Sequence, residues 1–162
     1  KRMNKTITLI LALLLGTAAN AQTNIDLGGI SADPKAPVEV SADNLSVDQD
    51  SGTAVFSGNV VIGQGDLRLS AGSVRVVYSD STGDIAQLLL TDGVTLVTDS
   101  EAAEAATADY NLTTGILTLS GSVLLTQGAS ALSAEQMTID LNSGRAQMSG
   151  RVRTVFQQDG NN

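Results

Sequence analysis

The sequence predicts an all-β protein whose strands come from repeated units of about 30 residues. Three observations carry this prediction: apolar and polar side chains alternate along several segments, one short motif recurs, and turn-forming residues separate the segments. A strand places successive side chains on opposite faces, so the alternation is typical of a sheet with one buried face. We expect roughly 12 to 16 short antiparallel strands in a twisted sheet.

One short motif defines the repeat. It occurs at 52–60 (GTAVFSGNV), 115–123 (GILTLSGSV) and 144–152 (GRAQMSGRV), with a degenerate copy at 83–94. The second glycines of successive copies are 35, 28 and 29 residues apart. Glycine weakens a strand interior and often marks a bend, so its recurrence at one place per unit predicts a sharply curved sheet. A related stretch precedes each copy, at 41–43 (SAD), 70–72 (SAG), 106–109 (ATAD) and 133–135 (SAE).

The alternation within each copy defines an inward face. Phe56, Leu119 and Met148 hold the same position in their copies and are expected to face the interior together. Such residues either fill a core or line a ligand groove, and the pattern alone leaves both possibilities open. The full set of predicted inward-facing residues is Phe56, Val60, Ile62, Leu67, Leu69, Val74, Val76, Leu88, Leu90, Val94, Leu96, Leu117, Leu119, Val123, Leu125, Met137, Ile139, Met148 and Val152.

Runs rich in Asp, Ser and Gly at 48–52, 80–83 and 142–144 are turn signals between strands. The first run begins like a calcium loop, but its twelfth position is Asn59 and not the required glutamate. We therefore predict a structural turn without a metal ion. The segment 101–108 (EAAEAATA) favours helix by composition but has no apolar stripe, so we predict a loop or one helical turn there.

The first 21 residues are typical of a cleavable export signal. Positive residues precede an apolar run at 7–15, which is shorter than the roughly 20 residues that span a bilayer. Ala19-Asn20-Ala21 then forms a small-x-small cleavage site, so we expect cleavage after Ala21. A retained anchor is the lesser alternative, and Met3 is an alternative start.

The rest of the chain is expected to form one domain, since about 140 residues can bury a substantial core. Residues 22–37 contain glycine and proline without apolar periodicity, which predicts a flexible lead-in. The β domain is expected at 38–157, and the polar residues 158–162 are expected to form a disordered tail.

Composition disfavours several functional classes. The chain has no His and no Cys, so a Ser-His-Asp triad, a thiol nucleophile and His- or Cys-based metal sites lack their residues. Without the export signal it keeps 6 Lys+Arg against 17 Asp+Glu, which argues against nucleic acid because that partner needs a basic face. The absence of Trp disfavours sugar binding. We predict a non-enzymatic protein without a cofactor; a glycosidase using Asp48 and Asp50 is the enzymatic alternative.

Several of these motifs together resemble the OstA-like domain of the LptA family of periplasmic lipopolysaccharide-transport proteins. The residues that carry the resemblance are 40–43 (VSAD), Gly52, 56–60 (FSGNV), 64–65 (QG) and 70–71 (SA), echoed at 119–123 (LSGSV), 127–128 (QG), 133–135 (SAE) and 151–155 (RVRTV). The resemblance covers about residues 38 to 157, nearly all of the chain after the export signal.

The resemblance implies an open, twisted, V-shaped β-jellyroll located in the periplasm. It implies that the protein carries lipopolysaccharide between inner- and outer-membrane transport components. The implied protein partners are LptC-like and LptD-like proteins, which share the fold and join end to end. Open sheet ends carry unpaired backbone groups, so we also predict head-to-tail strand addition between copies of this chain.

On this basis the inward-facing set becomes the candidate groove for lipid A acyl chains. Each buried methylene contributes about 0.8 kcal/mol, so acyl chains can be held without charged contacts. Arg75, Arg151 and Arg153 are candidate contacts for the lipid A phosphates, or are simply solvated residues of strand faces. Two non-enzymatic alternatives stay open: a structural β-solenoid with a dry core, and a soluble LptC-like component.

Overall fold

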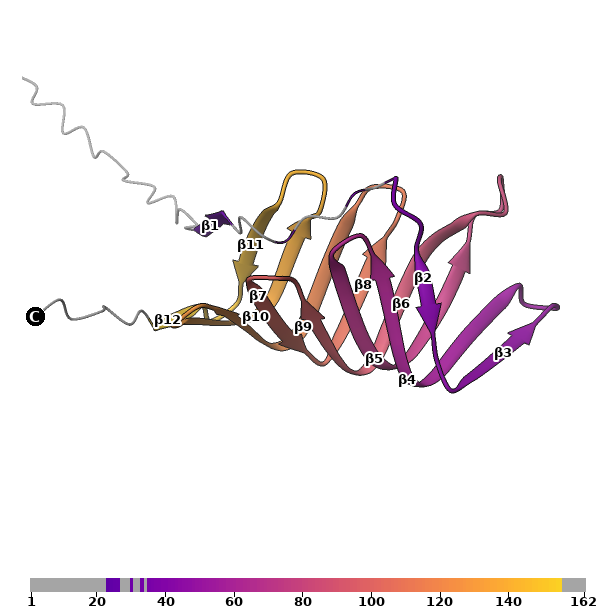
Figure 1. Ribbon diagram of the computed structural model, residues 1–162, viewed down its shortest axis with the longest axis horizontal. Helices are drawn as coiled ribbons and strands as arrows, with labels where there is room; N and C mark the ends of the chain where they lie inside the picture. Colours follow the sequence, from indigo (N-terminus) through magenta and orange to yellow (C-terminus); the bar gives the residue numbers. More distant parts are fainter. Residues whose placement is uncertain (1–22, 27–29, 31–32, 34, 156–162) are drawn as a thin grey trace, which may run out of the picture.

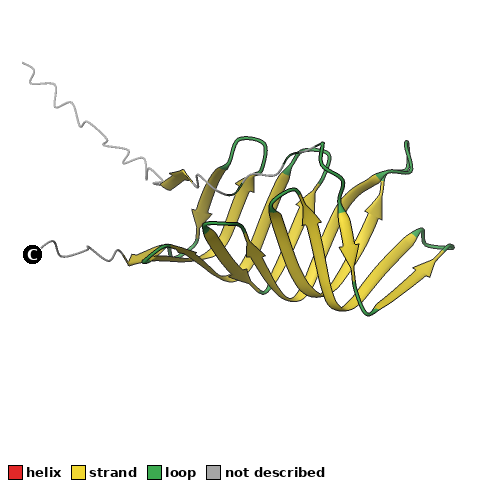
Figure 2. Cartoon of the chain, in the orientation of Figure 1, coloured by secondary structure: helices red, strands yellow, loops and turns green. Residues whose placement is uncertain are grey.

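The computed structural model of the chain describes residues 23–26, 30, 33 and 35–155. Throughout these residues the regular structure is β, and all twelve strands join in one antiparallel sheet, which confirms the predicted all-β fold (Figures 1 and 2). The strands are β1 Thr23–Asp26, β2 Glu39–Ser41, β3 Asn44–Asp48, β4 Thr53–Gln64, β5 Leu67–Tyr78, β6 Ile85–Val97, β7 Glu101–Ala105, β8 Thr107–Asn111, β9 Ile116–Gln127, β10 Ser130–Asp140, β11 Arg145–Ser149 and β12 Arg153–Val155. Within the described part of the chain, no helix has the length and hydropathy needed to cross a membrane.

The sheet is folded along one line that crosses every long strand. Residues 53–57 of β4 pair with β3, whereas residues 61–63 of the same strand pair with β2. The other long strands divide in the same way, so the sheet becomes two layers that share an interior. We call the line of bends the crease; its residues are 43, 58–59, 72, 92–93, 106, 121–122, 135 and 150–151. Figure 1 shows the bends along the lower side of the molecule.

The first layer contains β1, β3, β8, β11 and the halves of the long strands that pair with them. The second layer contains β2, β7, β12 and the other halves. We call the strand ends farthest from the crease the rim. The sheet begins with β2 and β3. It ends with β12 in the second layer and with β11, followed by β1, in the first layer, and these two ends lie at opposite ends of the molecule (Figure 1).

Pairs of left-handed residues produce the crease. Gly58 and Asn59 have φ of 77° and 47°, and Gly121 and Ser122 have φ of 85° and 50°. The ladder between β4 and β5 shifts register at this point, as expected for a bulge that bends a strand. A Cβ atom at Gly121 would lie 2.7 Å from the Cβ of Ala106, so the neighbouring strand approaches too closely for a larger residue. The second glycine of each motif copy therefore marks the point at which a strand bends at the crease.

The segment 101–108 was expected to be a loop or a helical turn, and this prediction is wrong. It forms β7 and the start of β8, which continue the sheet on either side of Ala106. Ala103 and Ala108 are buried and β7 pairs with both β6 and β9, so packing and ladder hydrogen bonds outweigh the helical preference of alanine. Because Ala106 is the crease residue, the equivalent of 41–43 is 104–106, and not 106–109 as the sequence indicated.

Part of the predicted lead-in, 22–37, lies within the described residues. Thr23–Asp26 forms β1, which pairs antiparallel with β11 at the far end of the sheet. Ile30 is fully buried, and the amide of Ala36 donates a 2.9 Å hydrogen bond to the carbonyl of Asp33. The predicted export signal, 1–21, and the predicted tail, 158–162, lie outside the described residues.

Candidate functional site

The predicted inward-facing residues meet between the two layers. All except Phe56 and Val152 are at most 2 % exposed, and they belong to one continuous apolar cluster. Leu119 and Met148 lie in the first layer beside the crease, at the positions their repeat copies predicted. Phe56 holds the equivalent position on β4 and is half-buried against the same cluster. The interior is therefore continuous, mainly aliphatic and closed along its middle.

Val152 is an exception to the predicted pattern, since it is 40 % exposed. Its repeat equivalents Val60 and Val123 continue directly into long strands that are paired on both sides. After Gly150 and Arg151 the chain instead enters β12, a three-residue strand that pairs with β10 alone. Among the described strands none lies beyond this edge, so Val152 is left uncovered.

The interior includes buried residues that the sequence analysis did not select. Leu132 and Ala134 alternate with the half-buried Ser133 on β10, so the period-two rule could have found them. Ile30 could not have been found in this way, because it stands in a segment without periodicity.

A polar contact joins the two layers at the rim. The hydroxyl of Tyr110, on β8 in the first layer, donates to Oε1 of Gln64, the last residue of β4 in the second layer. Nε2 of Gln64 donates in turn to the carbonyl of Ala36 at 3.2 Å. Burial raises the pKa of Tyr110, and the hydrogen bond to Gln64 opposes that shift only in part. The contact holds the layers together opposite the crease.

Tyr110→Phe is expected to lower the free energy of unfolding by about 1 to 3 kcal/mol, because Oε1 of Gln64 would be left buried without its donor. The wild-type protein should also lose stability as pH rises above about 10, where unfolded tyrosine ionises before the buried phenol does. Tyr110→Phe should lack the part of this loss of stability that comes from ionisation of Tyr110. Urea unfolding at pH 8 to 11 measures both effects, and Tyr78→Phe, at a side chain 42 % exposed, is the control. Equal losses in the two variants would contradict the role of the contact.

The apolar interior reaches the surface where the sheet begins. Leu45 and Val47 on β3 are 56 % and 61 % exposed, and their cross-strand partners are Phe56 and Ala54. Cross-strand partners share a face, so Leu45 and Val47 lie on the inner face of the first layer. They are exposed because β3 pairs with β4 on one side and, in the part of the chain that the structure describes, has no strand on its other side. We call Leu45, Val47 and Phe56 the open end.

The three predicted phosphate-contacting arginines all lie away from the interior. Arg75 stands between two buried residues of β5, and so points outward into a pocket of about 320 Å³. Arg151 lies at the crease, where Nε donates to Oε1 of Glu135 at 2.7 Å. Arg153 lines an outer pocket of about 700 Å³ with Arg151 and Glu135. Of the three, Arg75 lies nearest the open end, beside the β3–β4 turn.

The β3–β4 turn has the predicted structural role. Oδ1 of Asp48 accepts hydrogen bonds from the amides of Asp50 and Ser51 at 3.0 and 3.4 Å, and Gly52 has a φ of 61°. The side-chain hydrogen bond from the hydroxyl of Ser51, followed by these two amide hydrogen bonds, lowers the pKa of Asp48. Asp140 ends β10 in a similar turn, in which Ser143 and the amide of Asn142 donate to its carboxylate.

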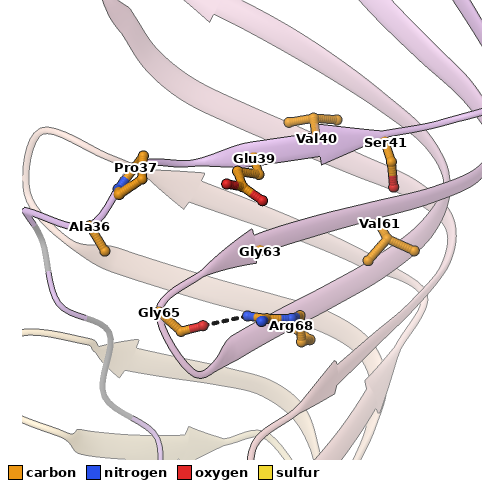
Figure 3. A pocket seen from close by; sticks show the side chains of 9 residues that line it. All are labelled: Ala36, Pro37, Glu39, Val40, Ser41, Val61, Gly63, Gly65 and Arg68. Carbon is orange, nitrogen blue, oxygen red and sulfur yellow. Dashed lines mark hydrogen bonds between the residues drawn. The ribbon is translucent and has the colours of Figure 1, made fainter.

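A further outer pocket, of about 450 Å³, lies where β2 meets β4 and β5. Figure 3 shows Glu39 on β2 and Arg68 on β5 lining it, with Gly63 between them. The guanidinium of Arg68 donates to the carbonyls of Gly65 and Leu67, so its charge is already partly engaged. A pocket with one carboxylate and one engaged guanidinium has no strong preference for an anion or a cation.

Comparison with known proteins agrees with this architecture. Residues 39–145 match the family described as "LptA/(LptD N-terminal domain) LPS transport protein". An uncharacterized protein of Rhizobium meliloti (strain 1021) is 29 % identical over 154 residues, which cover 88 % of this chain and 83 % of that protein. The lipopolysaccharide export system protein LptH of Pseudomonas aeruginosa is 33 % identical over 75 residues, 46 % of this chain and 42 % of that protein.

The fold is also that of a solved structure. The crystal structure of LptH, the LptA-homologous periplasmic component of the lipopolysaccharide transport device of Pseudomonas aeruginosa, aligns with a TM-score of 0.68 and 19 % identity. The alignment covers 78 % of this chain and 99 % of that one. The family match extends from β2 to the start of β11, across both layers and the crease. The chain therefore belongs to the LptA and LptD N-terminal domain family of lipopolysaccharide transport proteins.

Proposed function

We propose that the protein is a periplasmic carrier that holds the acyl chains of lipopolysaccharide between its two β-layers. The observation that supports this most directly is the continuous aliphatic interior, which reaches the surface at the open end formed by Leu45, Val47 and Phe56. Membership of a lipopolysaccharide transport family and an exposed apolar entrance together favour a lipid ligand over a polar, water-soluble ligand.

The closed middle of the interior sets a condition on binding. Residues such as Leu69, Leu96 and Leu125 are fully buried, so acyl chains must displace their contacts or part the layers. Each methylene that leaves water contributes about 0.8 kcal/mol, so several chains supply enough free energy to replace side-chain contacts with lipid contacts. Because the strands are continuous across the crease, the layers can open there as a hinge while the ladders stay paired.

The phosphates of lipid A would remain outside the interior. Arg75 is the best placed cation for them, since it lies on the outer face close to β3 and the open end. Arg151 must first leave Glu135, with which it forms an ion pair at 2.5 Å. The net negative charge of the chain weakens any binding that depends on phosphate alone, and the affinity therefore comes mainly from the acyl chains.

Handover would use the two ends of the sheet. β2 and β3 run from the rim of the second layer to the rim of the first, and β11 and β12 run in the opposite direction. The N-terminal edge of one molecule can therefore continue the C-terminal edge of another as an antiparallel sheet, beside β12 in the second layer and, once β1 has left it, beside β11 in the first layer. Copies of this chain, and LptC-like and LptD-like proteins with the same fold, are the proposed partners.

A photoreactive amino acid tests the carrier function in living cells. At Leu45 or Phe56, on the inner face, it should capture lipopolysaccharide severalfold more often than at Ser46 or Ser57, the next residues along the same strands and on the outer face. Purified protein should show the same contrast with added lipopolysaccharide. Equal labelling of both faces, or none on either, would contradict the proposal and favour a structural protein with a dry core.

A further inference from the structure

We propose that β1 is a built-in substitute for β3 of a second copy, and that it occupies the C-terminal edge until that copy displaces it. This inference rests on the end-to-end pairing proposed above. It assigns a regulatory role to a segment whose sequence suggested only a flexible lead-in, and it names the competitor for the edge as another molecule of this chain.

The position and direction of β1 carry the first step. Asn24, Ile25 and Asp26 pair with Gln147, Ala146 and Arg145 of β11. The strand therefore runs from the crease toward the rim in the first layer. β3 runs in the same direction in the same layer, from Asn44 beside the crease to Asp48 at the rim. β1 thus has the layer and the direction that β3 of a following copy would need.

The sequence of β1 carries the second step. β1 ends in Asn-Ile-Asp at 24–26, β10 ends in Thr-Ile-Asp at 138–140, and β3 ends in Ser-Val-Asp at 46–48. β10 flanks β11 on its other side in the same register, with Ile139 opposite Ala146 and Asp140 opposite Arg145. β11 therefore lies between two strands that both set Ile opposite Ala146 and Asp opposite Arg145 in their registers. β3 has a similar ending, a β-branched residue followed by Asp, so Val47 and Asp48 of a second copy can take the register positions of Ile25 and Asp26.

The exposure of the two ends carries the third step. Ala146 and Met148, on the inner face of β11, are 3 % and 2 % exposed, whereas Leu45 and Val47, on the inner face of β3, are 56 % and 61 % exposed. The inner face of the sheet is therefore buried at the β11 end and exposed at the β3 end. β1 covers only the first layer, because β12 pairs with β10 alone and Val155 is 65 % exposed.

The exchange favours the second copy for a physical reason. β1 can pair through four residues, all in the first layer. A second copy can pair through the five residues of β3 in the first layer and the three residues of β2 in the second layer. Replacing β1 also covers Leu45 and Val47, which remain exposed in the single molecule. Intramolecular pairing gives β1 the advantage at low protein concentration, and association gives β3 the advantage at high concentration.

Disulfide trapping tests the exchange, because the chain contains no cysteine of its own. Full-length Ser46→Cys protein is mixed with Gln147→Cys protein, since β3 in the place of β1 would set Ser46 opposite Gln147. The same mixture is prepared with Asn24→Pro and Ile25→Pro in the Gln147→Cys chain. Successive residues of a strand point their amides to opposite sides, so one of the two prolines removes a donor that faces β11. The cross-linked dimer should form in both mixtures, with a severalfold higher yield when the prolines weaken β1.

Two controls make the outcome specific. Gln147→Cys mixed with Thr95→Cys, on the central strand β6, should give only a background yield. A single chain with Asn24→Cys and Gln147→Cys should stay monomeric when oxidised and associate again when reduced, which tests the cap without the prolines. A matched chain with Thr118→Cys and Thr138→Cys, which ties β9 to β10, should associate in both states.

The outcomes separate the inference from the function on which it rests. An equal dimer yield with and without the prolines, together with normal association of the oxidised 24–147 chain, overturns the role of β1 but keeps end-to-end pairing. No specific dimer in either mixture overturns both the pairing of copies and the role of β1. The carrier function is judged separately, by lipid capture at Leu45 and Phe56.

Discussion

Leu119→Ala is expected to lower the free energy of unfolding by about 2 to 5 kcal/mol, among the largest effects of any single truncation in this fold. Leu119 is fully buried, and its cross-strand partners are Ala108 on β8 and Met137 on β10. Ala108 is too small to fill the space that the shorter side chain would leave. The lost transfer free energy therefore adds to the cost of a cavity beside the crease.

Urea denaturation of Leu119→Ala and Leu124→Ala measures this effect with a matched control. Leu124 is on the same strand and carries the same side chain, but it points outward and is 39 % exposed. Its truncation should cost less than about 1 kcal/mol, the range of β-strand preferences at exposed positions. Losses of similar size in the two variants would show that the interior is loosely packed, and would favour a permanently open groove.

The second large effect is expected at the crease. Gly121→Ala should destabilise the protein by about 1 to 3 kcal/mol more than Gly93→Ala does. Both glycines have left-handed backbones, with φ of 85° and 80°, so both variants carry the same conformational strain. Only at Gly121 does the new Cβ meet a neighbour, the Cβ of Ala106 at 2.7 Å.

The double variant Gly121→Ala with Ala106→Gly is the decisive control for this steric explanation. Removing the Cβ of Ala106 should restore a large part of the stability lost in Gly121→Ala, although glycine at position 106 has its own entropic cost. Thermal unfolding of the four proteins gives the coupling between the two sites. Additive losses would mean that the backbone conformation alone, and not the close approach of strands, makes glycine necessary at this bend.

Much of the fold could be predicted from the sequence because period-two alternation and the glycine repeat are local signals. The copies at 52–60 and 115–123 predict both which face is buried and where the strand bends, and the structure confirms both. The segment 101–108 shows the limit of such signals. Its alanines favour helix in isolation, and only the ladders to β6 and β9 make them a strand.

The candidate site divides in the same way. The inner-face residues follow from alternation, but their packing does not, because closure depends on how two halves of one sheet meet across the interior. The burial of Ile30 and the hydrogen bond between Tyr110 and Gln64 depend on segments that are far apart in the sequence, so no local sequence pattern predicts them. Arg151 was predicted as a phosphate contact, and its pairing with Glu135 follows from adjacency at the crease, which the sequence spacing does not show.

The order in which strands pair has a consequence for the folding route of the protein. From β2 to β12, strands mostly pair with those that precede or follow them along the chain, so the sheet can grow by successive hairpins with low loop-closure entropy. β1 is different, because its partner β11 is about 120 residues away and must form first. The strand that is made earliest is therefore placed last. Each newly folded molecule passes through an interval in which the outer side of β11 is available to a neighbour, and encounters during that interval need no displacement step.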